Sequence, residues 1–126
     1  MRIFIWILQV ALAGLFNLAG FAKGFQPVEA LHANIPWAQD VPLWLLRLIG
    51  FSEILGANGV ILPAVTRIKP GLTPLAAGGL ALVMALAILF HLTRGEFGLM
   101  LGPLFLFALA AFVAYARLKL VPIAPR

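Results

Sequence analysis

Residues 74–93 read PLAAGGLALVMALAILFHLT, an apolar stretch that carries no ionisable side chain before His91. A helix rises 1.5 Å per residue, so about 20 residues cross the hydrocarbon core of a bilayer. This stretch therefore predicts a transmembrane helix. Thr73 fits the N-cap position and Pro74 the first turn, because proline needs no hydrogen-bond partner there.

Three other stretches meet the same length requirement: Ile3 to about Phe25, Leu43 to Leu62, and about Gly98 to Leu118. The first is longer than the apolar core of a signal peptide, so we expect it to be retained as a helix. Within the last, Pro103 leaves two alternatives: a helix that begins at Pro103, or one that starts near Gly98 and kinks. We expect the kinked helix, because residues 103–117 alone would barely span.

Composition excludes a water-soluble fold. Of the 126 residues, 63% are hydrophobic and only 10% are charged, whereas soluble domains have about 25% charged residues. The chain has no cysteine, which excludes a disulfide scaffold, a thiol relay and Cys-ligated clusters. We therefore predict an all-α integral membrane protein with one domain, residues 1–126, folded as an antiparallel up-down four-helix bundle.

The charged residues predict the orientation. The net charge is +5, but the basic residues lie singly at the ends of apolar stretches, which indicates topology signals and lipid-headgroup contacts and no nucleic-acid partner. With four spans, one side holds Arg2, Arg67, Lys69, Arg117, Lys119 and Arg126 and no acid; the other holds Lys23, Arg47 and Arg94 with Glu29, Asp40 and Glu96. The positive-inside rule then places both termini in the cytoplasm.

Residues 26–42 are expected outside the membrane as an interfacial segment. Pro27 can start a short helix on which Val28, Leu31 and Ile35 share one face. Trp37 and Trp44 suit the headgroup level.

Small residues suggest where helices touch. Candidates are Gly20 with Gly24, Ser52 with Gly56, and the ladder of Ala77, Ala81 and Ala85. Such positions allow close backbone approach in a bilayer, where lipid provides no hydrophobic drive for association. The alanine ladder is the clearest of the three.

Glu53 is the most informative polar residue. It falls near the middle of the second span, about 15 Å from its outer end, where a charge costs about 2.5–3.5 kcal/mol. It should therefore face the bundle interior with a partner, or be protonated. We predict a buried polar cluster around an outward-facing cavity, a candidate ligand or proton site, made of Glu53, Arg47, His91, Arg94, Asn17, Lys23 and Glu96.

A structural alternative stays open for the same residues. A Glu–Arg pair can fix helix register, Arg94 and Glu96 can be solvated turn residues, and His91 can cap a helix end. The sequence contains no nucleophile elbow, P-loop, dinucleotide fingerprint or HExxH motif. With one membrane histidine and no cysteine, we expect no metal site and no catalytic residue can be named.

Four segments resemble the DoxX-like family of small four-helix membrane proteins: residues 50–63 (GFSEILGANGVILP), 72–77 (LTPLAA), 91–96 (HLTRGE) and 110–117 (AAFVAYAR). The resemblance implies a bundle in a bacterial-type inner membrane. Glu53, His91, Arg94 and Glu96 match recurrent polar positions of the family, whereas Asn58 stands where an aliphatic residue is usual. Relatives include a small subunit of a thiosulfate:quinone oxidoreductase, membrane partners of redox-defence enzymes and, more distantly, assembly chaperones.

Three functions follow as hypotheses. The first is an accessory subunit, not an enzyme on its own, that binds a protein partner or a lipid-like molecule through the outer cavity. The second is a membrane subunit of a quinone-linked oxidoreductase in which Glu53 relays protons while a partner supplies the redox centre. The third, an oligomeric transporter, needs association into a homo-oligomer because four helices leave little room for a pathway. No intrinsic cofactor is expected; the candidate ligands are a quinone or a lipid.

Overall fold

The structure, a computed structural model, describes residues 2–35 and 37–125. Within these residues every regular element is helical. The elements are α1 (Arg2–Phe25), α2 (Val28–Asn34), the 3₁₀ turn η1 (Ala38–Asp40), α3 (Leu43–Thr66), α4 (Leu72–Thr93), the 3₁₀ turn η2 (Phe97–Met100), α5 (Leu101–Tyr115) and the π-helical turn η3 (Ala116–Leu120).

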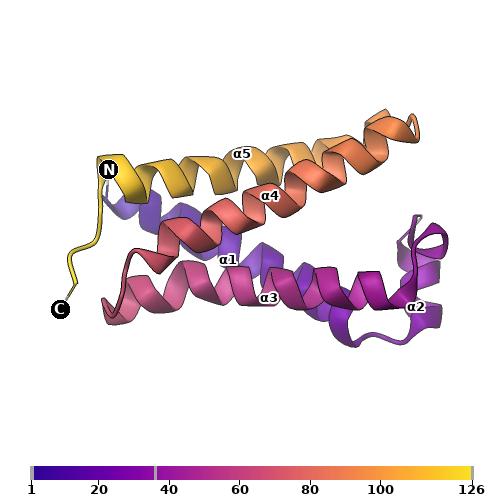
Figure 1. Ribbon diagram of the computed structural model, residues 1–126, viewed down its shortest axis with the longest axis horizontal. Helices are drawn as coiled ribbons and strands as arrows, with labels where there is room; N and C mark the ends of the chain where they lie inside the picture. Colours follow the sequence, from indigo (N-terminus) through magenta and orange to yellow (C-terminus); the bar gives the residue numbers. More distant parts are fainter. Residues whose placement is uncertain (1, 36, 126) are drawn as a thin grey trace.

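The four long helices form a bundle whose connections lie at two ends (Figure 1). Both chain ends and the α3–α4 connection lie at one end, here called the terminal end. The segment holding α2 and η1 and the α4–α5 turn lie at the other, here called the α2 end. α3 and α4 diverge from the terminal end toward the α2 end. This divergence determines where the cavity described below can form.

The bundle exposes apolar side chains on its outside as well as burying them. Its core joins all four helices through residues such as Leu12, Phe16, Val60, Leu80 and Val113. The outer surface carries large aliphatic and aromatic side chains along every long helix. Four helical segments are long and apolar enough to cross a membrane: Arg2–Phe25, Leu43–Thr66, Leu72–Thr93 and Phe97–Leu120. The chain is an integral, multi-pass membrane protein, because only lipid solvates such a surface.

Two helices extend beyond the predicted spans near the α3–α4 connection. α3 continues through Pro63 to Thr66 and ends where Arg67 adopts a left-handed backbone conformation. Proline removes one backbone hydrogen bond, and membrane helices tolerate this where neighbouring groups satisfy the backbone. The prediction of Thr73 as an N-cap is wrong: Gly71 precedes α4, and the Thr73 hydroxyl donates to the Val60 carbonyl of α3 at 3.2 Å.

The last span starts close to the predicted Gly98, because the helical segment runs from Phe97 to Leu120. A 3₁₀ turn begins at Phe97 and leads into α5 at Leu101. Pro103 is the third residue of α5 and therefore lies in its first turn, where a backbone N–H has no intrahelical acceptor to lose. The predicted start near Gly98 is thus confirmed to within one residue, and the helix changes from 3₁₀ to α geometry at Leu101, before the proline.

The backbones of α1 and α3 approach each other closely. A Cβ atom added at Gly50 would lie 2.5 Å from the Gly24 nitrogen and 2.8 Å from the Gly20 oxygen. These two backbones therefore touch directly, which only glycine permits. In the alanine ladder, Ala77 and Ala81 are buried in the core, and Ala85 is half-buried.

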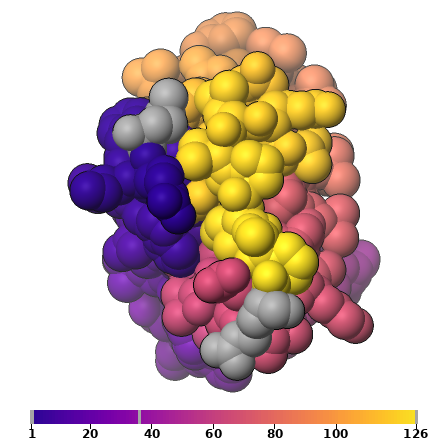
Figure 2. All heavy atoms as spheres, turned by 90° about the vertical axis from the view of Figure 1, so that its left-hand side faces the viewer, coloured from indigo at the N-terminus to yellow at the C-terminus, as the bar shows by residue number. Residues whose placement is uncertain are grey.

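The C-terminal segment covers part of the terminal end. Figure 2 shows the last residues lying between the start of α1 and the α3–α4 connection. A hydrogen bond of 3.0 Å from the Arg67 Nε to the Ala124 carbonyl ties this segment down. Arg126, one of the basic residues used to predict orientation, lies outside the described residues.

Candidate functional site

The α1–α3 glycine contact positions an ion pair inside the bundle. Lys23 lies in the last turn of α1 and Glu53 on α3, each beside the point where Gly20 and Gly50 meet. The Lys23 Nζ donates to the Glu53 Oε1 at 2.8 Å. Glu53 is only 1% exposed, so its carboxylate is shielded from lipid and is paired.

Arg47 supports this pair through the backbone. Its Nη1 donates to the Lys23 carbonyl at 3.0 Å. That carbonyl lies in the last turn of α1, where backbone oxygens lack intrahelical donors. Arg47 thus fixes the end of α1, and with it the Lys23 side chain, while making no ion pair with Glu53 among the described residues.

Asn17 lies in the α1–α3 interface rather than with the ion pair. Its Oδ1 accepts a hydrogen bond of 3.2 Å from the Asn58 Nδ2. The same Asn58 nitrogen also donates to the Ile54 carbonyl at 2.9 Å. The extra asparagine at position 58 therefore has a partner on the neighbouring helix.

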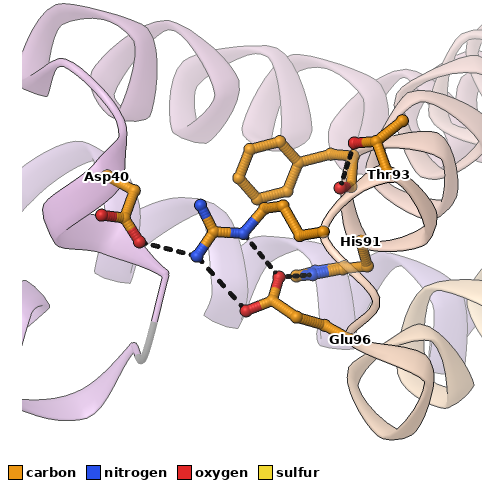
Figure 3. A network of polar contacts seen from close by, with 6 residues as sticks. Asp40, His91, Thr93 and Glu96 are labelled. Carbon is orange, nitrogen blue, oxygen red and sulfur yellow. Dashed lines mark hydrogen bonds and ion pairs between the residues drawn. The ribbon is translucent and has the colours of Figure 1, made fainter.

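A second polar group lies at the α2 end (Figure 3). The His91 Nδ1 and the Arg94 Nε both contact the Glu96 Oε1, at 3.0 and 2.8 Å. The Arg94 Nη2 reaches across to the Asp40 Oδ2 at 2.6 Å. Figure 3 shows Asp40 on one side of this network and His91 with Glu96 on the other. The network thus joins η1 to the α4–α5 turn.

The charges of this network stabilise one another. Hydrogen bonds from Arg94 and then His91 lower the pKa of Glu96 below its ordinary value. Hydrogen bonds to Glu96 and then Asp40 raise the pKa of Arg94. A carboxylate can only accept, so the His91 Nδ1 carries a proton, and in the neutral ring Nε2 is an acceptor.

A cavity of about 420 Å³ lies between the diverging halves of α3 and α4. Its walls are mainly aliphatic, with Leu45 and Ile49 on α3 and Val83 and Ala87 on α4. Aromatic rings of Trp37 and Phe90, with centroids 5.7 Å apart, line it toward the α2 end. The polar residues on its wall are Lys23, Ser52 and His91.

The structure thus divides the predicted cluster into three groups. Lys23 and His91 line the cavity, and each carries one partner acid, Glu53 or Glu96. Arg94 forms an ion pair with Asp40 at the α2 end. Arg47 instead donates to a backbone carbonyl, and Asn17 accepts a hydrogen bond from another asparagine. Sequence reasoning did not include Asp40 and Ser52 in the site, and it placed Trp37 at the headgroup level without linking it to a cavity.

This arrangement suits binding of an amphipathic molecule. An apolar tail can pack against the aliphatic walls, and Lys23 and His91 offer an ammonium group and an imidazole to a polar head. Within the described residues, no group of three or more His, Asp or Glu side chains could hold a metal ion. The wall residues therefore favour binding by shape and hydrogen bonding.

Comparison with known proteins identifies the family. The sequence model of the DoxX-like family matches residues 7–113. No curated protein and no solved structure matches the chain. Because the match covers most of the sequence, the protein belongs to the DoxX-like family.

Proposed function

We propose that this member of the DoxX-like family is an accessory membrane subunit that binds a lipid-like molecule in the cavity between α3 and α4. The cavity carries the proposal: about 420 Å³ of mostly apolar space with Lys23 and His91 on its wall. A quinone or a lipid has the required form, an apolar tail with a polar head that accepts hydrogen bonds.

The proposal includes a placement in the membrane. An antiparallel bundle in a bacterial-type inner membrane, with both termini in the cytoplasm, would direct the α2 end outward. The cavity would then take its ligand from the outer leaflet or the outer aqueous side. Occupancy would change the surface formed by Trp37 and the Asp40–Arg94 bridge. A protein partner or a second copy of the chain would bind at that surface.

Trp37 provides the test, since its ring lines the cavity. In a Trp6→Phe, Trp44→Phe background, Trp37 is the remaining tryptophan. A decyl-substituted benzoquinone and a brominated fatty acid both quench indole fluorescence on contact, so we expect saturable quenching by at least one of them. Ala87→Phe, which fills the cavity, should abolish it, and Leu75→Phe, on an exposed position of the same helix, should not.

Two results would reject ligand binding in this cavity. One is a Trp37 signal that neither probe quenches saturably. The other is equal quenching in Ala87→Phe and Leu75→Phe, which would mean that the probes reach Trp37 from bulk lipid.

A second candidate function is a subunit of a quinone-linked oxidoreductase. It is favoured by the Lys23–Glu53 pair, because Lys23 reaches the cavity wall while its partner carboxylate lies in the bundle. Such a pair could transfer protons to a reduced quinone, with electrons supplied by a partner protein. Copurification of a cofactor-bearing protein, together with slower quinone reduction in Glu53→Gln, would support this function; unchanged electron transfer would exclude it.

A further inference from the structure

The terminal half of the bundle contains a buried polar network that the cavity does not use. The Gln9 Nε2 of α1 donates to the Val60 carbonyl of α3 at 3.0 Å. Thr73 of α4 donates to the same carbonyl. The Gln9 Oε1 in turn accepts from the Arg117 Nε. Side chains from α1, α4 and η3 thus converge on one level of the membrane near the terminal end.

Arg117 is the unusual member of this network. Arg117 is buried, with only 5% of its surface exposed. The Nη1 donates to the Val121 carbonyl at 2.8 Å, and the guanidinium lies 5.2 Å from the centre of the Trp6 ring. The Nη2 is buried and has no hydrogen-bond partner within the described residues. A buried donor without an acceptor destabilises the folded state, and more so when the group is charged.

No side-chain carboxylate of the chain can neutralise this charge. The chain has 4 acidic residues: Glu29 and Asp40 in the α2 segment, Glu53 paired with Lys23, and Glu96 in the α4–α5 turn. The charged side chains described near the terminal end are all basic: Arg2, Arg67, Lys69, Arg117 and Lys119. The Arg117 Nη2 thus has room for an acceptor from another molecule, and the excess of positive charge at this end favours an anion.

We propose that Arg117 anchors a binding site for a phosphate-class anion, and that this anion is the headgroup of an anionic phospholipid. A guanidinium binds two oxygens of one phosphate through its fork of N–H groups. Leu118, the next residue after Arg117, is an exposed apolar residue against which the acyl chains of a bound lipid would lie. A lipid therefore satisfies both the charge and the apolar surface, whereas free phosphate satisfies only the charge.

The C-terminal segment controls access to this site. It is held by the Arg117–Val121 and Arg67–Ala124 hydrogen bonds, and it lies over the terminal end (Figure 2). A headgroup phosphate would replace the Val121 carbonyl at Nη1 and add an acceptor at Nη2. Lipid binding therefore requires a local displacement of residues 121–125 and leaves the bundle intact.

The test compares thermal stability of the full chain in nanodiscs of phosphatidylcholine, alone or with about one-fifth phosphatidylglycerol. We expect the anionic lipid to raise the Tm by about 4 °C or more. Arg117→Gln should lose this rise, and Arg117→Lys should lose most of it because lysine lacks the fork. Lys119→Gln removes an exposed charge at the same end and should keep it.

Several outcomes would overturn the proposal. The first is that the anionic lipid does not raise the Tm of the wild-type protein. The second is that Arg117→Gln and Arg117→Lys both retain the rise in Tm. The third is that Lys119→Gln loses the rise to the same extent as the Arg117 variants. Inorganic phosphate added to phosphatidylcholine discs tests the source: an equal rise with phosphate alone would reject the lipid. If Arg117→Gln does not fold, native mass spectrometry compares the wild type with Arg117→Lys. We expect only the wild type to retain phosphatidylglycerol preferentially, and equal retention by the two would reject the site.

Discussion

Lys23 and Glu53 form an ion pair in which the two residues depend on each other. A buried carboxylate 2.8 Å from an ammonium is tolerated because the pair as a whole is neutral. We predict that Lys23→Met destabilises the bundle by about 3 kcal/mol, because it leaves the Glu53 carboxylate buried without a counter-charge. Unfolding of the reconstituted protein by denaturant, followed by circular dichroism, measures this loss.

The double variant is the control for this prediction. Lys23→Met with Glu53→Leu removes both charges, so most of the lost stability should return. A double variant as unstable as Lys23→Met alone would show that lysine contributes through its packing and not through the pair.

The Glu96 network predicts a pH dependence at the α2 end. The pKa of Glu96 is lower in the folded protein than its ordinary value, so the ionised form favours the folded turn. This contribution is present above the ordinary pKa and is lost as the pH falls through the folded value. The groups facing Glu96 are Arg94 and His91, and Asp40 faces Arg94 from η1.

We therefore expect the α2 end to loosen as the pH falls below about 4.3, the ordinary pKa of a glutamate. In the single-tryptophan background, the Trp37 emission should shift to longer wavelength over this range, because its ring lies 5.9 Å from that of His91. Glu96→Gln should show the shifted emission already at neutral pH and no such step at lower pH. An unchanged step in that variant would exclude Glu96 as the origin of the transition.

At the scale of the helix, the α1–α3 crossing should be intolerant of even one added methyl group. A Cβ at Gly50 would meet backbone atoms of α1 at 2.5 and 2.8 Å, so Gly50→Ala must separate the helices. We predict a destabilisation of about 1–3 kcal/mol and a weakened Lys23–Glu53 contact. Gly78→Ala is the matched control: nothing lies within 4 Å of its added Cβ, so stability should rise by about 0.5–1 kcal/mol. Equal effects of the two variants would mean that the close approach is not maintained in the membrane.

Hydropathy and length were sufficient to predict four helices, because a spanning segment must hide its own backbone from lipid. They were less informative about helix ends. The predicted span ends at Leu62, yet α3 continues through Pro63 to Thr66. Thr73 had the chemistry of a cap but donates to Val60 instead. The acceptor of Thr73 lies on a neighbouring helix, and local sequence contains no information about that neighbour.

At the scale of the molecule, the sequence indicated which polar residues are unusual but not which of them meet. Glu53 was predicted to need a partner, and its partner comes from the end of α1, thirty residues away. Arg47, nearer in sequence, binds a backbone carbonyl. Asp40 was counted only as a charge outside the membrane, and its contact with Arg94 depends on how far α4 diverges from α3. Arg117 was treated as a topology signal, because spacing along a chain does not reveal burial.

Orientation is the remaining property of the whole molecule, and the charge asymmetry predicts it. The described basic residues Arg2, Arg67, Lys69, Arg117 and Lys119 lie toward the terminal end, which has no acidic side chain to offset them. Retention of positive charge in the cytoplasm should therefore place the terminal end inside and the α2 end outside. The chain lacks cysteine, so a single introduced thiol reports the side on which it lies.

Gln39→Cys at the α2 end and Ile68→Cys at the terminal end are both on exposed positions. In intact spheroplasts, a membrane-impermeant maleimide should label Gln39→Cys and leave Ile68→Cys unlabelled until the membrane is opened by detergent. The reverse pattern would turn the cavity toward the cytoplasm and move the Arg117 site to the outer leaflet. Labelling of both variants before detergent is added would indicate that the chain inserts in two orientations. The charge difference between the two ends should prevent this, because each inverted chain would have to carry these basic residues across the bilayer.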